Sequence, residues 1–477
     1  MEALQRLHNR GSISTGYDVD YSLKFETDNT EYLMAEGRPQ GTQTTWTWSC
    51  WLKRTEVDNG SVAQYIFSAG SDGKTGIYFR DDASYPDDRI FIYVDEGNSL
   101  KWIGQVNQSF RDTAAWYHIV FAVDSTDGTA ADRTKIYVNG VQQTITFNAT
   151  LNQNVSTRVG DGGGKFSIGG KVANTGYGFN GYMAECVLVD GSALGPTSFG
   201  KFDDDSGIWK PKNVSGLSLG TAGFYMNFDD SSNVGAVQTG TSQGNFDKYN
   251  LTAADQATDT PTNNFCTMNM LNRTDGNSKT QEGGTKVTTD GGSGWCSMVA
   301  SMGVTKGKWY WETQRSGGSS DSNDVVTGIV GSEDIFIPYS PNAKYYIGNV
   351  ATSSSMGFYT TGVPNVRNGD GGSLSNSAGD IIMIGLDMDN GKLYFGINGT
   401  WDALGTGGST LHADFDGEFV LPAVAVYQGK QIKINFGGYA SYTISSAETD
   451  ADGYGTFEYA VPTGYYALCT KNLEEYG

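Results

Sequence analysis

The stretch that most constrains the fold is a predicted β-hairpin between Trp116 and Val141. Its first half, Trp116–Asp124, is a continuous run of aromatic and β-branched residues, which favours a central strand of a packed sheet. Its second half, Lys135–Val138, ends at Asn139-Gly140, a pair that tolerates the positive φ of a tight turn. The chain is therefore predicted to contain a β-sandwich built around this hairpin.

The second half of the chain repeats this arrangement. Ile381–Asp387 and Lys392–Ile397 are strand-like runs joined by Asp389-Asn390-Gly391, and Asn398-Gly399 follows them. Helical periodicity is nearly absent, whereas 65 of the 477 residues are glycine with no fixed period, as is typical of a turn-rich β protein. The predicted fold class is all-β, with two β-sandwiches in tandem.

Side-chain alternation identifies the residues expected in the first core. Trp46, Trp48, Cys50 and Leu52 fall on one face of a period-two strand. Trp102, which alternates with Leu100, is also expected in the core. The five cysteines are odd in number and have no Cys-x-x-Cys spacing, so we expect no disulfide framework or zinc site, and folding in a reducing compartment. Cys50 and Cys186 fall within strand-like runs and are expected to be buried.

The composition along the chain predicts four segments. Residues 1–18 are expected to form an arm that docks on a partner, with Leu4 and Leu7 on one face of a short helix and Arg6 and Arg10 elsewhere around it; a disordered terminus is the alternative. Residues 19–235 are predicted to be the first sandwich and 265–477 the second. The Ser-, Thr-, Asn-, Asp- and Gly-rich stretch 236–264 is predicted to be an extended connector.

The charge of the chain limits its partners. The formal net charge is −21, which argues against duplex nucleic acid because phosphate contacts require a basic surface. No run approaches the roughly 20 apolar residues that a membrane span requires, so no membrane span is predicted. The first ten residues also lack the apolar core of a secretory signal.

Short segments of the sequence, taken in their order along the chain, resemble two protein families. Ser22–Phe25, the Trp46–Leu52 strand, Trp116-Tyr117-His118, Ile136–Gly140 and Gly181-Tyr182-Met183 resemble a laminin G-like domain of the concanavalin A-like lectin/glucanase group. Gly307–Glu312, Gly379–Asp387, Tyr394-Phe395 with Asn398-Gly399, and Asn435-Phe436-Gly437 resemble a SPRY domain. The resemblance implies two concanavalin A-like sandwiches of the jelly-roll type, but no particular ligand, because one fold serves many functions.

The tandem as a whole resembles bacteriophage virion proteins of the tail-fibre or adhesin type. The pieces that carry this resemblance are Trp209-Lys210-Pro211, Thr260–Cys266 and Tyr459–Tyr466. It implies a virion component that folds in the host cytoplasm and is released by lysis. Its expected partners are other virion proteins, bound through the N-terminal arm, and a host-surface glycan. A homo-oligomer is also expected, because weak single-site sugar affinity gains from multivalency.

Residues for catalysis are hard to find in the sequence. The Glu-x-Asp-x-x-Glu strand of the glucanases in this group is missing, and the three histidines, His8, His118 and His412, have no nearby cysteine or serine that suggests a triad. His118 is expected to be a packed, hydrogen-bonded strand residue. The prediction is therefore a protein that is not an enzyme; the alternatives are a capsid decoration or collar protein without a receptor role, and a polysaccharide-degrading enzyme.

Ligand-binding residues are predicted from aromatic side chains, which can stack on sugar faces. The candidates are Tyr85, Tyr177, Tyr345, Tyr346 and Trp401. No cofactor is predicted. Laminin G-like domains sometimes bind calcium through loop carboxylates, and the resemblance makes Asp124, Asp127 and Asp161 the candidate ligands here. Asp387–Gly391 resembles the start of a calcium loop, but the Glu twelve places in is missing and a hairpin turn explains these residues better.

Overall fold

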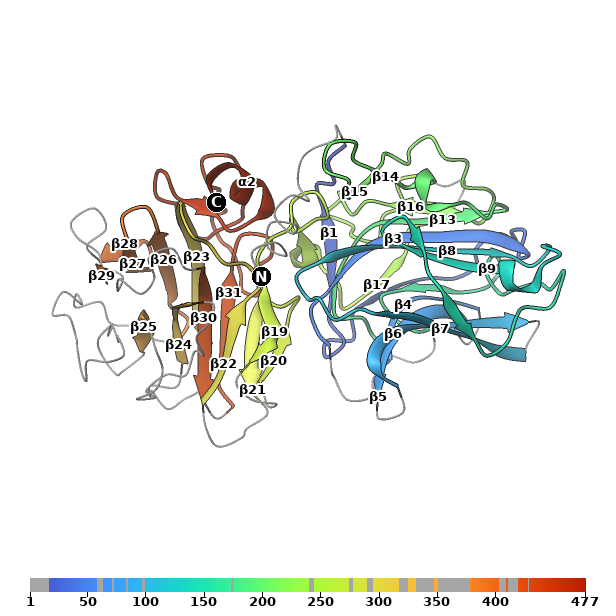
Figure 1. Cartoon of the computed structure of the whole chain (residues 1–477), viewed down its shortest axis with the longest axis horizontal. Coiled ribbons are helices and arrows are strands. Elements are labelled where there is room, and N and C mark those ends of the chain that lie inside the picture. Colours follow the sequence, from blue (N-terminus) through green and yellow to red (C-terminus); the bar gives the residue numbers. More distant parts are fainter. Residues whose placement is uncertain are drawn as a thin grey trace. The chain divides into compact units, whose positions relative to one another are not determined.

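The chain divides into two compact units, with the boundary in the sequence between Asn263 and Asn264 (Figure 1). A computed structural model describes residues 17–57, 63–70, 73–82, 85–96, 99–172, 176–239, 244–273, 278–289, 295–316, 325–331, 347–350, 378–402, 409–410, 419–427 and 429–477. Nearly all the regular elements are strands, which confirms the all-β prediction. The predicted arm with Leu4, Arg6, Leu7 and Arg10 lies outside the described residues.

The first unit contains two eight-stranded sheets. The first sheet has the order β10-β9-β8-β3-β13-β1-β18, and β16 also pairs with β13. Its strands are β1 (Ser22–Phe25), β3 (Thr45–Arg54), β8 (Trp116–Asp124), β9 (Thr134–Val138), β10 (Val141–Gln142), β13 (Gly181–Asp190), β16 (Phe224–Met226) and β18 (Gln256–Ala257). The predicted hairpin is confirmed as β8 and β9, which pair antiparallel from Ile119 opposite Val138 to Val123 opposite Thr134.

The second sheet of this unit has the order β11-β7-β6-β5-β4-β12-β2-β17. Its strands are β2 (Tyr32–Ala35), β4 (Gln64–Ala69), β5 (Thr75–Asp82), β6 (Tyr85–Glu96), β7 (Ser99–Ser109), β11 (Ile145–Phe147), β12 (Phe166–Ile168) and β17 (Asp247–Tyr249). We call the face of this sheet that points away from the core its outer face.

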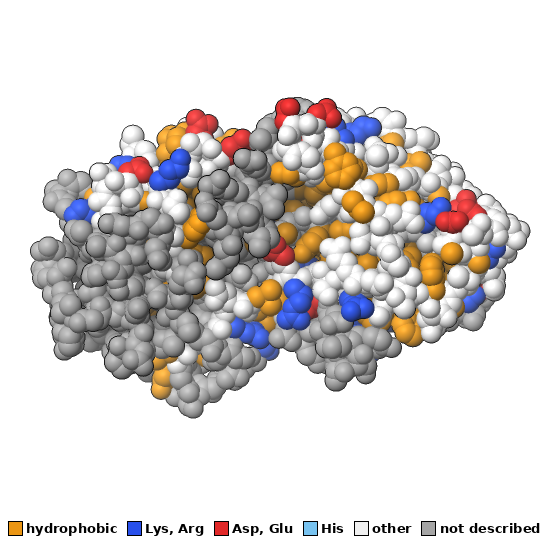
Figure 2. Space-filling view, viewed as in Figure 1, with side chains coloured by type: hydrophobic (Ala, Val, Ile, Leu, Met, Phe, Trp, Pro, Cys, Tyr) orange, Lys and Arg blue, Asp and Glu red, His pale blue; other side chains and the backbone are white. Residues whose placement is uncertain are grey.

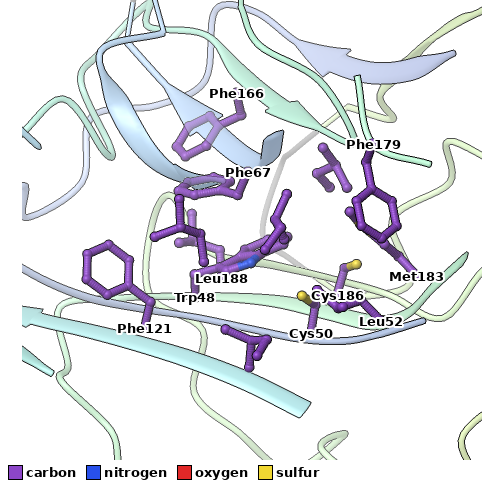
Figure 3. Packing of buried hydrophobic residues seen from close by; sticks show 14 of the residues in the cluster. Trp48, Cys50, Leu52, Phe67, Phe121, Phe166, Phe179, Met183, Cys186 and Leu188 are labelled. Carbon is purple, nitrogen blue, oxygen red and sulfur yellow. The ribbon is translucent and has the colours of Figure 1, made fainter. Parts of the chain in front are cut away.

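The core of the first unit lies between these two sheets. Trp46, Trp48, Cys50 and Leu52 are all fully buried in it, as their alternation predicts. Trp48 stacks on Phe67 of the opposite sheet, with ring centroids 4.6 Å apart and ring planes 12° apart (Figure 3). The core is therefore closed by aromatic contacts from one sheet to the other.

The first sheet is buried on both faces, which simple alternation does not predict. All ten residues of β13 are buried. Residues 196–226 pack across its other face, where Phe199, Val214 and Leu219 contact Val187 and Val189. This segment includes β14 (Gly200–Phe202) and β15 (Trp209–Pro211), near which hydrophobic side chains reach the surface (Figure 2).

A β-bulge in β13 carries a buried carboxylate. The pairing of β13 with β3 shifts register between Ala184 and Val187, and Glu185 has a φ of 51°. The Glu185 carboxylate accepts hydrogen bonds from the hydroxyls of Tyr17 and Tyr225, at 2.8 and 2.9 Å. Burial is the main cause that raises the pKa of Glu185 to about 7.

The segment predicted as an extended connector, 236–264, is instead part of the first unit up to Asn263. β17 pairs with β2 at the edge of the second sheet, and β18 pairs with β1 at the edge of the first. Between them, Thr252 and Asp255 form a capping box on the 3₁₀ helix Ala253–Asp255. The polar composition thus reflects turns and caps that the sequence pattern alone does not distinguish from a linker.

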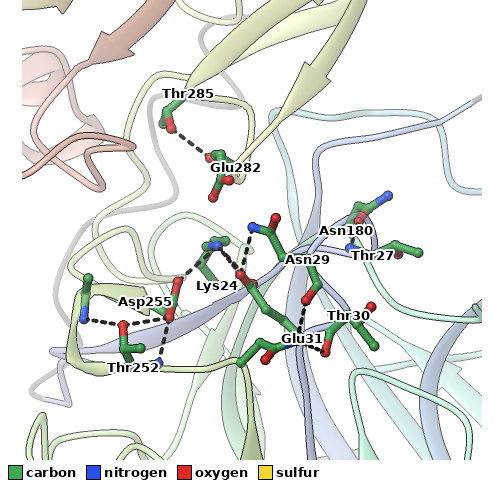
Figure 4. Close-up of polar contacts among 12 residues, drawn as sticks. Lys24, Thr27, Asn29, Thr30, Glu31, Asn180, Thr252, Asp255, Glu282 and Thr285 are labelled. Carbon is green, nitrogen blue, oxygen red and sulfur yellow. Dashed lines mark hydrogen bonds and ion pairs between the residues drawn. The ribbon is translucent and has the colours of Figure 1, made fainter. Parts of the chain in front are cut away.

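A buried ionic cluster holds this returning segment in place. The Lys24 ammonium lies 2.8 Å from Glu31 Oε2 and 3.0 Å from Asp255 Oδ1 (Figure 4). Nearby, Asp259 accepts hydrogen bonds from Lys53 Nζ at 2.8 Å and from Trp116 Nε1 at 3.0 Å. Each cation is matched by a carboxylate, which offsets the cost of removing both charges from water.

The second unit also consists of two sheets. The smaller has the order β19-β22-β30-β24-β25 and the larger the order β20-β21-β31-β23-β26-β27-β28, with β29 paired to β27 and β32 paired to β23. The strands are β19 (Met268–Arg273), β20 (Ser278–Gln281), β21 (Lys286–Thr289), β22 (Trp295–Ala300), β23 (Lys308–Ser316), β24 (Val325–Gly331), β25 (Ile347–Val350), β26 (Ile381–Asp387), β27 (Lys392–Ile397), β28 (Thr400–Asp402), β29 (Ser409–Thr410), β30 (Val420–Tyr427), β31 (Gln431–Asn435) and β32 (Tyr466–Ala467). The second predicted hairpin is confirmed as β26 and β27.

A separate core fills the second unit, with Trp309, Trp311, Ile384 and Leu386 at its centre. The other face of the larger sheet is covered by an aromatic cluster that includes Phe265, Tyr310, Phe457 and Tyr465, with Trp401 packed against it. The chain ends in the short helix α2 (Thr470–Tyr476). Among the described residues, no helix combines the length and the apolar character that a membrane crossing requires.

Candidate functional site

A row of aromatic side chains crosses the outer face of the second sheet of the first unit. Inward positions on its strands carry mainly aliphatic residues, such as Ile77, Ile90 and Ile92 in the core. The outward positions carry aromatic side chains that form a cluster of their own. We call this cluster the aromatic row; its members are Tyr65, Tyr78, Phe91, Tyr93, Trp102 and Tyr177.

Strand register brings these rings together. Tyr65 of β4 is directly opposite Tyr78 of β5, and Tyr78 is opposite Phe91 of β6. Tyr93 is opposite Trp102 of β7. A register shift in β4 next to Tyr65 allows Ile66 and Phe67 both to be buried in the core while Tyr65 joins the row.

The rings of the row are stacked almost parallel. Tyr65 and Tyr78 have centroids 4.6 Å apart and planes 17° apart. The Tyr78–Tyr93 and Tyr93–Trp102 pairs follow at 5.7 and 6.5 Å, with interplanar angles of 23° and 21°. Since neighbouring strands are about 4.8 Å apart, the row from β7 to the turn after β12 spans roughly 20 Å.

Exposure differs along the row. Phe91 at its centre is fully buried, whereas Tyr93, Trp102 and Tyr177 towards its ends are half-buried. The pKa values of Tyr65 and Tyr78 are raised, mainly by burial and secondarily by neighbouring tyrosines, so both stay neutral phenols at ordinary pH. Because the central ring faces cover one another, a ligand would contact the end rings and the outward edges of the row.

Two basic side chains lie over this row. The Lys171 ammonium is 5.5 Å from the ring centroids of both Tyr65 and Tyr177. The Arg80 guanidinium carbon is 5.5 Å from the centroid of Phe91. These distances are within the range of cation–π attraction, so the row combines aromatic surface with positive charge.

Of the predicted ligand-binding residues, the structure places Tyr177 at one end of the row, 6.1 Å from Tyr65 between centroids. Trp401 instead packs in the aromatic cluster of the second unit, 6.1 Å from Tyr310. The side chain of Tyr85 and the whole of Tyr345 and Tyr346 lie outside the described residues.

Most of the row was not predicted as a site, and the prediction that Trp102 belongs to the core was wrong. Trp102 is half-buried in the aromatic row, where its Nε1 donates to Gly104 O at 3.2 Å. The signal for the row is present in the sequence of β6, where Ile90, Ile92 and Val94 alternate with Phe91 and Tyr93. Aromatic residues at the outward-facing positions indicate that the outer face of the sheet is also apolar. The usual expectation that only one face of an antiparallel sheet is apolar misses this signal.

The three aspartates considered for calcium do not come together. Asp124 Oδ1 accepts from the backbone N and the hydroxyl of Thr126, and Asp127 Oδ1 accepts from Thr129 N. Asp161 Oδ2 lies 2.7 Å from Arg158 Nη1. Within the described ranges, no group of three or more His, Cys, Asp or Glu side chains could hold a metal ion. Asp124 and Asp127 each accept hydrogen bonds within their own turn, which accounts for a carboxylate at these positions without a metal ion.

In the described part of the first unit, His118 contacts the hydroxyl of Ser49. The hydrogen bonds of this pair do not allow the histidine to activate the serine as a nucleophile. Trp209 Nε1 donates to His118 Nδ1 at 3.0 Å, so Nδ1 must be unprotonated. The proton of the neutral ring is then on Nε2, which lies 2.9 Å from Ser49 Oγ and donates to it. His118 cannot take a proton from Ser49 in this tautomer, and the prediction of a packed, hydrogen-bonded histidine is confirmed.

Cys50 and Cys186 are buried, as predicted, and so are the other three cysteines. All five are free thiols, and Cys50 and Cys186 lie on neighbouring strands of the first core (Figure 3). Burial raises the pKa of Cys50 to about 12 and that of Cys186 well above its ordinary value. These thiols are therefore not nucleophiles at neutral pH.

Comparison with known families confirms both domain resemblances. Residues 27–197 match the concanavalin A-like lectin/glucanases superfamily, and residues 289–439 match the SPRY domain. Each match covers one of the two units in part, and the aromatic row lies within the first. Both matches are to binding folds of the lectin and SPRY types. No curated protein sequence matches the chain.

Solved structures with similar folds correspond to single units of the chain. The SPRY domain of human HERC1 is 19% identical and covers 35% of this chain and 96% of its own, with a TM-score of 0.27. A heptameric SAP-like pentraxin from Limulus polyphemus is 16% identical and covers 38% of this chain and 80% of its own, with a TM-score of 0.28. A human SPRY domain is 19% identical and covers 32% of this chain and 91% of its own, with a TM-score of 0.23.

Proposed function

We propose that this chain, which carries a concanavalin A-like domain and a SPRY domain, is a glycan-recognition protein and not an enzyme. The aromatic row is the observation that carries the proposal. It presents half-buried Trp102 and Tyr93 towards one end and Tyr177 at the other, on a sheet that fixes their spacing. Rings held by paired strands lose little conformational entropy when a sugar stacks on them, so they suit carbohydrate binding.

Binding measurements with single aromatic substitutions test this proposal. Purified full-length protein is screened against a panel of bacterial surface polysaccharides, and affinity is then measured for those bound by the wild type. Trp102→Ala and Tyr177→Ala should each weaken binding by about tenfold or more, as expected for an aromatic anchor. Phe202→Ala is the matched control, because Phe202 is 49% exposed on β14, outside the row.

Two results would count against a glycan-binding row. Wild-type protein that binds no polysaccharide of the panel would overturn the proposal. Equal affinity of the wild type, Trp102→Ala and Tyr177→Ala would instead assign binding to another surface. Release of reducing sugar by the purified protein, abolished by one Asp or Glu substitution, would establish the alternative of a polysaccharide-degrading enzyme.

The proposal extends to a role as a bacteriophage virion protein of the tail-fibre or adhesin type. The support is the tandem resemblance in Trp209-Lys210-Pro211, Thr260–Cys266 and Tyr459–Tyr466, together with a binding-type sandwich in each half. In this role the N-terminal arm would bind other virion proteins, and the chain would fold in the host cytoplasm and leave by lysis. Several copies together would raise the avidity for a host glycan.

Mass spectrometry of purified particles tests the virion role. The chain should be present at the low copy number of a fibre. Hundreds of copies per particle would favour the alternative, a capsid decoration or collar protein, and its absence from particles would refute the virion proposal. Locating the protein in electron micrographs of the particle would assign its position.

A further inference from the structure

The Lys171 ammonium lies over two aromatic rings at one end of the aromatic row. It lies 5.5 Å from the centroids of Tyr65 and Tyr177, whose rings are 6.1 Å apart and tilted by 46°. The side chain is half-buried at the end of the aromatic row, three residues after β12. Two aromatic faces therefore hold a cation at a fixed place beside a half-exposed ring.

Several other half-buried or buried lysines of this unit have a carboxylate partner. Lys24 contacts Glu31 and Asp255, Lys53 contacts Asp259, and Lys101 contacts Glu96. Lys171 forms no ion pair and no hydrogen bond with any residue that the structure describes. Among the described residues, the contacts of its ammonium are with the rings of Tyr65 and Tyr177. No described residue accepts its three N–H donors, which can therefore serve a ligand.

The backbone around Lys171 is fixed before any ligand arrives. The Ser68 hydroxyl accepts from Val172 N at 2.9 Å and donates to Gly170 O at 3.2 Å, so it holds both neighbours of Lys171. Gly73, at a φ of 66°, approaches the Lys171 stem so closely that an added Cβ would lie 3.1 Å from Lys171 Cγ. A side chain positioned in this way loses less entropy on binding than a free surface lysine.

We infer that Lys171, Tyr65 and Tyr177 form a subsite for a sugar that bears an anionic oxygen group, such as a carboxylate or a sulfate. The sugar ring would lie against Tyr177, and its anionic group would accept a charge-assisted hydrogen bond from the Lys171 ammonium. This inference rests on the proposed function, because it names the class of glycan that the aromatic row accepts. The acidic composition of the chain disfavours anionic polymers elsewhere on its surface, so selectivity depends on this lysine.

Matched pairs of polysaccharides test the subsite with the full-length chain. Polygalacturonate is compared with its methyl-esterified form, and dextran sulfate with dextran, so that the members of each pair share a sugar backbone and differ in the anionic group. Wild-type protein should bind at least one anionic member about tenfold or more tightly than its neutral partner. The preferred pair then distinguishes a carboxylate from a sulfate.

Substitutions at Lys171 assign that preference to the subsite. Lys171→Met keeps most of the aliphatic stem and should abolish the preference for charge and most of its salt dependence, whereas Lys171→Arg should retain both. Lys165→Met is the matched control, because Lys165 is nearby in sequence but is paired with Glu36. Circular dichroism and the unfolding temperature of each variant establish that it folds.

The outcomes separate the subsite from the wider proposal. If the wild type prefers neutral glycans, or if Lys171→Met keeps the preference for charge, the subsite is refuted while loss of binding in Trp102→Ala still supports the aromatic row. If the wild type binds no polysaccharide, both proposals fail. Loss of the preference in Lys171→Met, with retention in Lys171→Arg and Lys165→Met, supports the subsite.

Discussion

The Lys53 ammonium lies 2.8 Å from Asp259 Oδ2, although the two residues are 206 positions apart in the chain. The other oxygen of the same carboxylate accepts from Trp116 Nε1, and the Asp259 backbone carbonyl accepts from the Ser22 hydroxyl. One aspartate near the end of the first unit therefore binds three strands of the first sheet, β1, β3 and β8. All of these side chains are buried or nearly so.

Asp259→Ala should destabilise the first unit by about 3–5 kcal/mol, because it leaves the Lys53 charge buried without a partner. Unfolding by urea, followed by tryptophan fluorescence, measures this loss. Asp204→Ala, at an exposed position, is the control and should change stability by less than about 0.5 kcal/mol. Similar midpoints for the two variants would contradict the proposed anchoring role of Asp259.

Glu185 should make the stability of the protein fall as pH rises from about 4.5 to about 7. Its folded pKa of about 7 is above the ordinary value of 4.5, so in this window the folded state binds a proton that the unfolded state has lost. The stabilisation is complete below pH 4.5 and is lost as pH rises through 7, with a slope of at most about 1.4 kcal/mol per pH unit.

Glu185→Gln isolates this effect, since glutamine does not titrate and can still accept from Tyr17 or Tyr225. The free energy of unfolding of wild type minus variant should decline between pH 4.5 and 7 and be flat below 4.5. The remaining pH dependence of the variant includes Glu31, whose pKa burial also raises to about 7, and His118, which acts in the opposite direction. A pH-independent difference would show that Glu185 has an ordinary pKa.

His118 should stay neutral with its proton on Nε2 at pH 5. Burial lowers its pKa from 6.5 to about 3, so the stability that this residue contributes is present above pH 6.5 and is lost as pH falls towards 3. Long-range ¹H–¹⁵N spectra of the imidazole rings report both tautomer and charge. The chain has only three histidines, and a His118→Gln spectrum assigns the signal. Titration near pH 6.5 or a proton on Nδ1 would contradict the Trp209 hydrogen bond.

Glu312 should be essential to the second unit. Its fully buried carboxylate accepts from the hydroxyls of Tyr310 and Tyr442, each at 2.8 Å, and from the backbone N atoms of Glu458 and Tyr459. Glu312→Gln replaces one acceptor oxygen by a donor, so donors face donors. We expect a loss of about 1–3 kcal/mol.

Differential scanning calorimetry of the full chain measures the effect of Glu312→Gln. The transition of the second unit should move to lower temperature. Glu448→Gln, at an exposed position, is the matched control and should leave the profile unchanged. An unaltered profile for Glu312→Gln would mean that these four hydrogen bonds contribute little net stability.

The fold could be predicted from the sequence where the alternation of apolar and polar residues and the residues of the turns indicated the same strands. Trp46, Trp48, Cys50 and Leu52 were placed in the core correctly, and so were both hairpins that end in Asn-Gly. The apolar Trp116–Asp124 run indicated that its outer face is covered, but the segment that covers the first sheet could not be predicted in this way. This burial depends on residues 196–226 packing across Val187 and Val189, and contacts between segments far apart in sequence leave no periodic signal.

The candidate site was predicted only in part, for a related reason. Tyr177 was identified because it is an aromatic residue in a polar loop, whereas Tyr65, Tyr78 and Tyr93 belong to strands and resembled core residues. Their stacking follows from cross-strand register, which is fixed by the whole sheet and by the register shift beside Tyr65. The position of Lys171 over two aromatic rings could not be predicted either, because only the folded chain reveals which lysines contact a carboxylate.

The pairing of β17 and β18 with the edges of both sheets determines where the chain can be cut. A fragment that stops at residue 197, where the family match ends, or at 235 would lose the strands that cover β2 and β1. Uncovered edges pair with other copies, so such fragments should aggregate during purification. Expression of the first half alone must therefore run through Asn263, and proteolytic cleavage within 245–263 should expose the edges of β1 and β2.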